Sequence, residues 1–201
     1  IHAPLCENLN LFSLNRSDDA FPIRVKELIL QDVNIHTLDL SRYQQLQSLV
    51  LECKKLKVVD VSNNELLKSV NLLRVDQLTT LKSSSSNIWE SWFDILSQLQ
   101  HLTIIHNQDL TSSMLQKICD SCCFLESLHV ENCNRLERFD IDVPTLKKIT
   151  IKQVPRLHHL QFHFAAVRQL TLHDCPLLSD RAMTIVLGHC TSLCSLDLNR
   201  C

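Results

Sequence analysis

The sequence predicts an α/β solenoid, a fold in which short coils stack and bury their apolar side chains against one another. The first observation is a motif of the form L-x-x-L-x-L-x-x-C, which occurs at Leu193–Cys201, with valine in its third apolar place at Leu125–Cys133, and with valine in its first place at Val167–Cys175. Three apolar residues at this spacing form one edge of a strand and cannot make a core alone. Neighbouring copies must therefore stack to bury them.

The second observation is the period of the motif. Its middle leucine, or an aliphatic substitute, recurs eight times in steps of 21, 22, 21, 26, 21, 21 and 26 residues, at Leu38, Val59, Leu81, Leu102, Leu128, Ile149, Leu170 and Leu196. These steps fall within the roughly 20–29 residues of leucine-rich repeats. We therefore expect a leucine-rich-repeat horseshoe over residues 1–201, of about eight to nine repeats, with a parallel sheet on its concave side. A weaker copy surrounds Leu11 and Leu14.

A second apolar series lies between these positions and predicts extended segments on the convex side, because its apolar residues alternate with period two. Its central residues are Leu28, Leu49, Val70, Phe139 and Leu160. In the first half of the chain either series could line the concave side. We choose the Leu38 series because it alone stays in register through both 26-residue steps.

Short helices are predicted in the longer connections, over Ser112–Cys122, Ser179–Cys190 and Trp89–Leu96. The apolar stripe of the first helix is Met114, Leu115, Ile118 and Cys122. The stripe of the second is Ala182, Ile185, Val186 and His189, after a candidate N-cap at Ser179 and Asp180. The chain contains a single glycine, so the turns must depend on Asn, Asp and Ser, which tolerate left-handed or locally bonded backbone.

Composition excludes several classes of function. Twenty basic against 22 acidic residues argue against nonspecific nucleic-acid binding, which needs a basic excess. No apolar run approaches the roughly 18 residues of a membrane span, and Ile1–Asn10 lacks the pattern of a signal peptide. Several of the ten cysteines share one repeat position in line with the leucines. We therefore expect reduced thiols and an intracellular protein of the cytoplasm or nucleus.

The ninth position of the repeat is expected to be structural. It holds Asn64, Ser86, Asn107, Cys133, Val154, Cys175 and Cys201. An asparagine there can hydrogen-bond the backbone of adjacent turns, and a cysteine serves as a small buried residue. The pair Cys119 and Cys122 has no further ligand motif nearby, so we expect no metal and no cofactor. No histidine joins a nucleophile and an acid in a recognisable motif, so we expect no catalytic residues and no enzyme.

The outward residues of the strands are the candidate partner-binding site, because strand residues alternate between core and surface. We expect a protein partner on the concave face, at Asp39, Asp60, Lys82, Thr103, His129, Glu131, Lys148, Thr150, Lys152, Thr171, His173 and Asp197. The first coils are acidic there, whereas residues 135–168 hold seven basic residues against three acidic, which would suit a partner of mixed charge. The alternative is that these charges only solvate the sheet.

The two 26-residue units resemble the cysteine-containing repeats of F-box/LRR proteins. The matching residues are Cys175-Pro176-Leu177-Leu178-Ser179-Asp180, His189-Cys190-Thr191-Ser192-Leu193 and Leu196–Cys201 in the second unit, and Leu110-Thr111 with Cys122-Cys123-Phe124-Leu125 in the first. The resemblance implies the substrate-recognition part of an SCF-type ubiquitin ligase receptor, which does no chemistry itself. A Skp-type adaptor would bind only through an F-box outside this chain, so we expect a fragment of a longer protein.

Other functions stay open at this point. The first alternative is a leucine-rich-repeat scaffold or pathogen effector that has no F-box and binds a host or signalling protein. A small-molecule pocket is a second alternative, although the sequence holds no dense basic cluster of the kind that an inositol phosphate needs. We expect no contact with nucleic acid or membrane.

Overall fold

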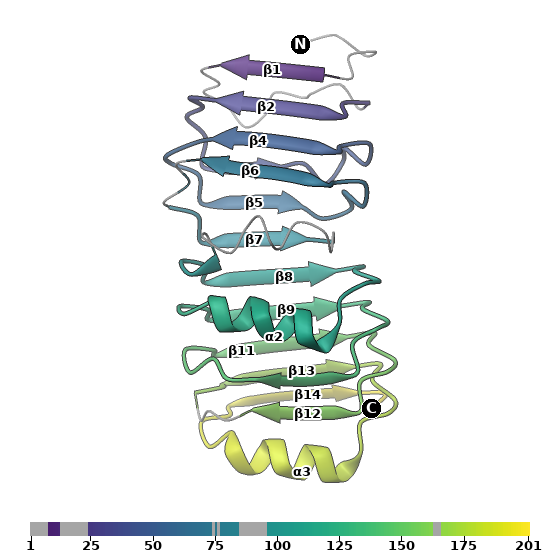
Figure 1. Cartoon of the computed structure of the whole chain (residues 1–201). Helices are drawn as coiled ribbons and strands as arrows, with labels where there is room; N and C mark the ends of the chain where they lie inside the picture. The colour runs from purple at the N-terminus through teal and green to yellow at the C-terminus, as the bar shows by residue number, and fades with distance from the viewer. Residues whose placement is uncertain (1–7, 13–23, 74, 76, 85–95, 163–165) are drawn as a thin grey trace. The chain divides into compact units, whose positions relative to one another are not determined.

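The computed structural model describes residues 8–12, 24–73, 75, 77–84, 96–162 and 166–201 (Figure 1). The chain forms two compact units, Ile1–Gln98 and Leu99–Cys201, which we call unit 1 and unit 2 and describe separately. Every strand pair is parallel, and successive strands of one sheet lie one coil apart along the chain. Each unit is therefore a parallel solenoid of the leucine-rich-repeat type.

In unit 1 the chain alternates between two sets of strands. The main strands, which carry the Leu38 series, are β3 (Thr37–Asp39), β5 (Val58–Val61) and β7 (Thr80–Ser83). The return strands are β1 (Asn8–Phe12), β2 (Glu27–Gln31), β4 (Ser48–Glu52) and β6 (Ser69–Leu73), in that order in their sheet. The predicted copy near Leu11 is a strand, and it pairs with the return strand β2, while Leu14 lies outside the described residues.

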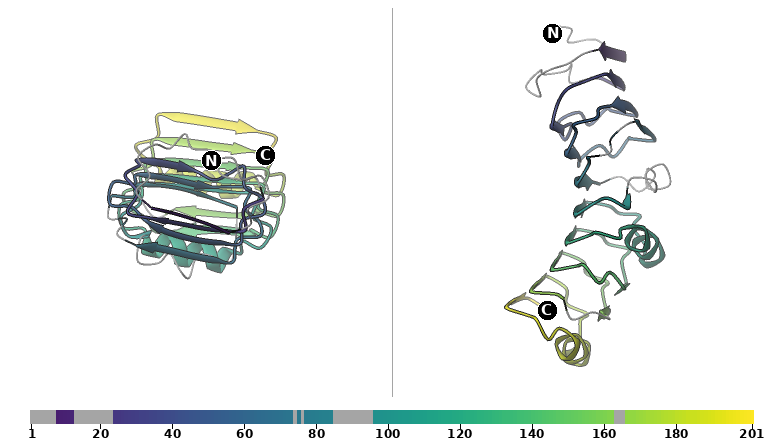
Figure 2. Two further views of the ribbon diagram at one scale, coloured as in Figure 1. Left: turned by 90° about the horizontal axis from the view of Figure 1, so that it is seen from above. Right: turned by 90° about the vertical axis from the view of Figure 1, so that its left-hand side faces the viewer.

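In unit 2 the main strands are β8 (His101–Ile105), β9 (Ser127–Glu131), β11 (Lys148–Lys152), β13 (Gln169–His173) and β14 (Ser195–Asn199). The return side has strands β10 (Arg138–Ile141) and β12 (His159–Phe162), with helices α2 (Ser112–Ser121) and α3 (Asp180–His189) in the two longer coils. Figure 2 shows both helices on the side of the coils away from the main strands. Helix α2 packs against β10, and α3 packs against β12.

The strand register confirms both predicted series. On the main strands, Leu38 pairs with Val59 and Val59 with Leu81, and in unit 2 the aligned column is Leu102, Leu128, Ile149, Leu170 and Leu196. On the return strands, Leu28, Leu49 and Val70 align, as do Phe139 and Leu160. All of these except Leu196 are buried, so stacked ranks of aliphatic side chains form the core of each unit.

The helices begin where the sequence indicates. Thr111 caps α2 by accepting a hydrogen bond from the Met114 N–H, and Ser179 caps α3 in the same way from the Ala182 N–H. The α2 stripe is confirmed at Leu115, Ile118 and Cys122, and Met114 is half-buried. The helix predicted over Trp89–Leu96 lies outside the described residues, apart from the buried Leu96. The described helices include none that is long and apolar enough to cross a membrane.

The predicted stripe of α3 is wrong in part. Val186 is buried and Ala182 half-buried, but Ile185 and His189 are exposed. A helix in a solenoid is covered only where a neighbouring coil lies against it, and the main packing of α3 against another described element is on β12. The edge strand β14 behaves likewise, since its core-side Leu196 and Leu198 are 42% and 46% exposed.

The turns use left-handed backbone, as the scarcity of glycine predicts. Positive φ values occur at Asp32, Asn63, Asn132 and Asp174, which are Asn or Asp, and also at His106, Gln153 and Arg200. All of these except Asp32 stand directly before the ninth position of their repeat. Left-handed backbone is strained for residues other than glycine and mildest for Asn and Asp. The geometry of the coil therefore imposes this conformation even where the residue type does not favour it.

The ninth position is structural, as expected, although not in the last repeat. Asn64 is fully buried, and its amide donates hydrogen bonds to the carbonyls of Leu40 and Tyr43 at 3.1 and 2.8 Å. Asn107, Cys133, Val154 and Cys175 are also buried, and Ser86 lies outside the described residues. Asn107 does not make the predicted bond to an adjacent turn among the described residues, since its Oδ1 accepts from the Asp109 N–H of its own turn at 3.1 Å. Cys201 is exposed instead, because it follows the edge strand β14, although its thiol still donates to the Leu172 carbonyl at 3.3 Å.

Candidate partner-binding face

The outward face consists of the main-strand side chains that alternate with the buried ones. In unit 1 the register places Asp39, Asp60 and Lys82 side by side on β3, β5 and β7, as the sequence predicts. Each is followed two residues later by a serine, at Ser41, Ser62 and Ser84. Adjacent parallel strands are about 4.8 Å apart, so these residues form two short polar columns.

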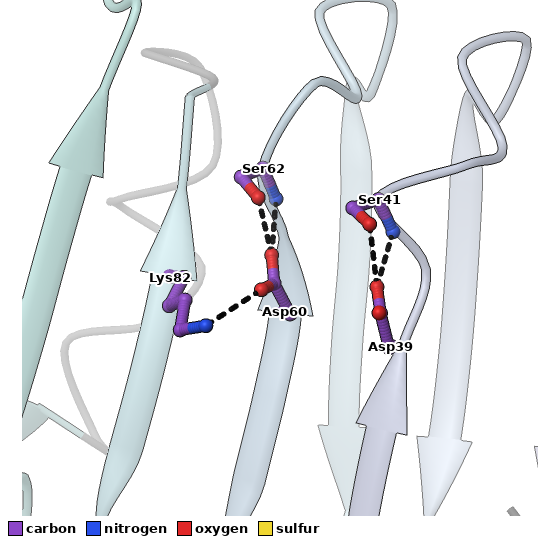
Figure 3. Close-up of polar contacts among 5 residues, drawn as sticks. All are labelled: Asp39, Ser41, Asp60, Ser62 and Lys82. Atoms are coloured by element: carbon purple, nitrogen blue, oxygen red, sulfur yellow. Dashed lines mark hydrogen bonds and ion pairs between the residues drawn. The ribbon is translucent and has the colours of Figure 1, made fainter.

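Asp39 and Asp60 are each fixed by the serine two residues later (Figure 3). Asp39 Oδ1 accepts from the Ser41 N–H at 2.9 Å and from the Ser41 hydroxyl at 2.6 Å. Asp60 Oδ1 accepts from the Ser62 N–H at 3.0 Å and from the Ser62 hydroxyl, while its Oδ2 lies 3.0 Å from Lys82 Nζ. The hydrogen bonds from Ser41 lower the pKa of Asp39. Asp39 is thus held ionised, and Lys82 compensates the charge of Asp60.

In unit 2 two longer columns line up in register. The first is Thr103, His129, Thr150, Thr171 and Asp197, and the second is Ile105, Glu131, Lys152, His173 and Asn199. His129 Nε2 lies 3.0 Å from Glu131 Oε2, within one strand. His173 Nε2 lies 2.9 Å from Asp197 Oδ2, across strands, at ion-pair distance but not in hydrogen-bond geometry. The columns are therefore linked by polar contacts both along and between strands.

The imidazole of His129 favours the neutral form. Burial lowers the pKa of His129, and the nearby cations Lys152 and Lys148 lower it further, against the opposing effect of Glu131. A charged imidazole there would have to lose solvent while facing two ammonium groups. Among the described residues, no serine, threonine or cysteine side chain forms a hydrogen bond with His129 or His173, so these two histidines activate no nucleophile there.

Some predicted site residues lie elsewhere or are covered. Thr150 is only 9% exposed, so it offers little surface to a partner. Lys148 is the first residue of β11 and pairs with Ser127 and Gln169, outside both columns. The remaining predicted residues lie in the columns of their own unit.

The predicted basic stretch does not form one basic face. Arg135 lies in the turn after β9 and pairs with Asp109 at 3.0 Å. Arg138 is on the return strand β10, near Asp140 at 3.9 Å. The basic excess of residues 135–168 is therefore not a basic excess of the outward face, because a coil carries charged side chains on both of its sides.

The structure adds a shallow groove that the sequence analysis missed. It has a volume of about 390 Å³, lies at the start of strands β8, β9, β11 and β13, and is lined by His101, Glu126, Ser127, Lys147, Lys148, Arg168 and Gln169. Lys147 Nζ contacts Glu126 Oε1 at 2.6 Å. The 21-residue spacing of Glu126, Lys147 and Arg168 is the signal that would have predicted it.

A second missed feature is a series of side-chain contacts between turns that are 26 residues apart. The Asn132 amide donates to His106 Nδ1 and the Asn134 amide to Gln108 Oε1, each at 2.7 Å. Arg200 contacts Asp174 at 3.3 Å. These contacts lie at the other end of the main strands from the groove, and they join successive turns.

The cysteines do not build a chemical site in the described part of the chain. The nine described cysteines are free, and the described residues include no group of three or more potential metal ligands. Burial raises the pKa of the Cys119 thiol well above its usual range and that of Cys122 to about 12. Both groups are therefore protonated and poor nucleophiles at neutral pH.

Comparison with known proteins adds little to this picture. No protein-family model matches the chain, and no curated protein matches it. Among solved structures, the chain is similar to the crystal structure of an internalin (inlF) from Listeria monocytogenes str. 4b F2365, at 15% identity with a TM-score of 0.35, over 89% of this chain and 68% of that one. A likeness this low carries no argument about function. The fold rests on the repeats and the strand register, which make each unit a leucine-rich-repeat solenoid.

Proposed function

We propose that this chain is a protein-binding module and that the outward face of its main strands is the docking surface. The observation that carries the proposal is the set of in-register columns of polar side chains on that face, in both units. These outward positions alternate with the buried leucines, so substitutions there leave the packing of the core unchanged. Asp60 is part-buried and held by an ion pair with Lys82, and His129 is part-buried and hydrogen-bonded to Glu131, which pre-organises both for contact.

The dimensions of the face favour an extended partner over a small molecule. Five main strands in unit 2 span about 19 Å at a spacing of about 4.8 Å, close to the length of six extended residues. Two grooves on the described residues have volumes of about 160 and 390 Å³ and are open to solvent. A small-molecule site normally encloses most of its ligand in an apolar cleft.

Substitutions at Lys152 test the proposal directly. The full-length protein and a Lys152→Glu variant would each be used to capture partners from the cells that make it, with quantification by mass spectrometry. We expect at least one protein whose capture falls about 30-fold or more, as for loss of an interface hot spot of about 2 kcal/mol. Lys117→Glu is the matched control, because it makes the same charge change on the exposed surface of α2. Equal effects of the two variants on every partner would refute the proposal.

A finer form of the proposal is that the partner is the substrate of an SCF-type ubiquitin ligase. It is supported by the resemblance of the 26-residue coils to F-box/LRR repeats, with their capped helices and the buried Cys133 and Cys175. Capture of a Skp-type adaptor and a cullin by the full-length protein would support it. If the folded full-length protein binds no adaptor, this form fails, and the alternative of a scaffold or effector takes its place.

An intracellular location is part of the proposal. It is supported by the free, buried thiols, since burial also raises the pKa of Cys133 to about 11 and that of Cys175 to about 12. Fractionation of cells that make the full-length protein tests it. Recovery in the cytoplasm or nucleus is expected, and recovery only from the medium would contradict the proposal.

A further inference from the structure

The groove of unit 2 is built from two neighbouring columns at the start of the main strands. One column is His101, Ser127, Lys148 and Gln169, which pair in register on β8, β9, β11 and β13. The other is Glu126, Lys147 and Arg168, each directly before a strand. The backbone amides of Lys147 and Lys148 both donate to the Glu126 carbonyl, and those of Arg168 and Gln169 both donate to the Lys147 carbonyl. The hydrogen-bonded backbone of the sheet thus fixes the Cα positions of all seven lining residues.

The charges of the groove do not cancel. Three cations, Lys147, Lys148 and Arg168, face one carboxylate, Glu126, which leaves a charge of +2 on these four side chains. Lys147 and Glu126 are paired at 2.6 Å, so the excess resides on Lys148 and Arg168. Among the described residues, neither of these two side chains makes a hydrogen bond or an ion pair. Lys148 pairs in register with Gln169, the neighbour of Arg168, and adjacent strands lie about 5 Å apart, so the two cationic groups can meet on one ligand.

This donor set matches a phosphate monoester. Such a group carries about −1.5 to −2 charges at neutral pH and has three strong acceptor oxygens. The guanidinium of Arg168 can bind two oxygens in parallel, Lys148 supplies a point charge, and Ser127 and Gln169 add neutral donors. A carboxylate, with one charge and two oxygens, would leave a cation uncompensated. A neutral ligand would leave the charges of both Lys148 and Arg168 uncompensated.

We propose that this groove binds the phosphate of a phosphorylated serine or threonine in the protein partner. The inference rests on the proposed function, because the groove borders the polar columns of the outward face at Lys148, the first residue of β11. A partner segment that lies across β9, β11 and β13 would bring a side chain into the groove. Phosphorylation of the partner would then control its capture.

Peptide binding to the 201-residue chain tests this inference. The probe is a fluorescein-labelled peptide mixture with phosphoserine fixed at the centre and random residues at the flanking positions. The comparison ligands are the same mixture with serine or aspartate at the centre, and inorganic phosphate as a competitor. We expect the phosphoserine mixture to bind at least about ten-fold more tightly than either other mixture, because hydrogen bonds to charged groups are among the strong ones. We also expect it to bind at least about ten-fold more tightly than free phosphate.

Two double variants separate the groove from general electrostatics. Lys148→Gln with Arg168→Gln should abolish the preference for phosphoserine, while circular dichroism shows the fold retained. Lys117→Gln with Arg156→Gln removes the same charge from exposed positions of unit 2 outside the groove and should leave the preference unchanged. Equal binding of the serine and phosphoserine mixtures would overturn the inference, as would equal losses in the two double variants. Free phosphate that binds as well as the peptide would also overturn it.

The outcome is separable from that of the proposed function. Partner capture that still depends on Lys152, without any preference for phosphoserine, would overturn this inference alone. Capture that is insensitive to Lys152 counts against the proposed function, whatever the peptides do.

Discussion

Asn64 offers the sharpest test of how the coils are held together. Its side chain is 0% exposed, and its amide donates to the carbonyls of Leu40 and Tyr43 in the preceding coil. Each of these carbonyls also accepts one backbone hydrogen bond, from the Tyr43 and Leu46 N–H groups. Asn64→Ala would therefore remove two hydrogen bonds without leaving either carbonyl unpaired, since a carbonyl oxygen has two lone pairs. Asn64→Asp would instead place carboxylate oxygens against two carbonyl oxygens.

The magnitudes follow from these contacts. Two buried hydrogen bonds at about 0.5–1.5 kcal/mol each give a loss of about 1–3 kcal/mol for Asn64→Ala. This corresponds to a fall in Tm of about 2–12 °C at about 2–4 °C per kcal/mol. Asn64→Asp should cost more, although it keeps the size of the side chain, because a buried carboxylate has no donor there. Burial and the two carbonyls should raise the pKa of the new carboxyl above its unfolded value. Its excess cost over Asn64→Ala should then shrink as pH falls, because the folded state favours the protonated form.

Urea unfolding followed by circular dichroism measures these effects. Glu65→Ala is the control, since Glu65 is exposed beside Asn64 and its loss should change stability by no more than about 0.5 kcal/mol. Each variant is compared with the parent chain at pH 7 and at pH 5, so that acid effects common to both chains cancel. If Asn64→Ala costs no more than Glu65→Ala, the hydrogen bonds do not hold the coils together. If Asn64→Asp is milder than Asn64→Ala at pH 7, the donor argument is wrong.

Three further predictions concern the core, the outward face and the turns. Leu128→Ala should lower the free energy of unfolding by about 2–5 kcal/mol. Leu196→Ala should lower it by less than half as much, because Leu196 is 42% exposed. Equal losses of the two variants in urea unfolding would contradict this prediction. Burial lowers the pKa of His129, so the unfolded chain binds more protons below about pH 6.5 and stability falls as pH falls through that range. His129→Gln should flatten this slope between pH 7 and 5.5, and an unchanged slope would exclude His129 as its source. Gln153→Gly should raise Tm by about 1–4 °C in calorimetry, because φ at Gln153 is 51° and left-handed backbone costs a non-glycine residue about 1–2 kcal/mol, about half of which is offset by the greater freedom of glycine in the unfolded chain. A lower Tm would show that the turn is not strained.

The repeat spacing alone was enough to predict the strands and their register. A solenoid aligns equivalent positions of successive coils, so Leu38, Val59 and Leu81 had to become neighbours once the period was recognised. The same reasoning predicted the polar columns, because strand residues alternate between two sides. The helix starts at Thr111 and Ser179 were also predictable, since capping is a local interaction.

Several features depended on neighbours that the local pattern does not reveal. Ile185 and His189 have helical spacing with Val186, yet they are exposed, because burial needs an adjacent coil on that side. Thr150 looks equivalent to Thr103 and Thr171 in the sequence, but only Thr150 is covered. The charges of Arg135 and Arg138 lie close in sequence to Lys148 but leave the outward face, since the coil turns between them.

What the sequence by itself determined is the repeat, the strand register and the columns, because each depends only on period and alternation. What only the tertiary structure decided is which charges meet. Glu126, Lys147 and Arg168 are 21 residues apart and become neighbours only when the coils stack. Pairing of Lys147 with Glu126 then leaves Lys148 and Arg168 as the cations of the groove. Net charge and composition do not reveal this pair of cations, because electrostatic interactions depend on distance in space and not on separation along the chain.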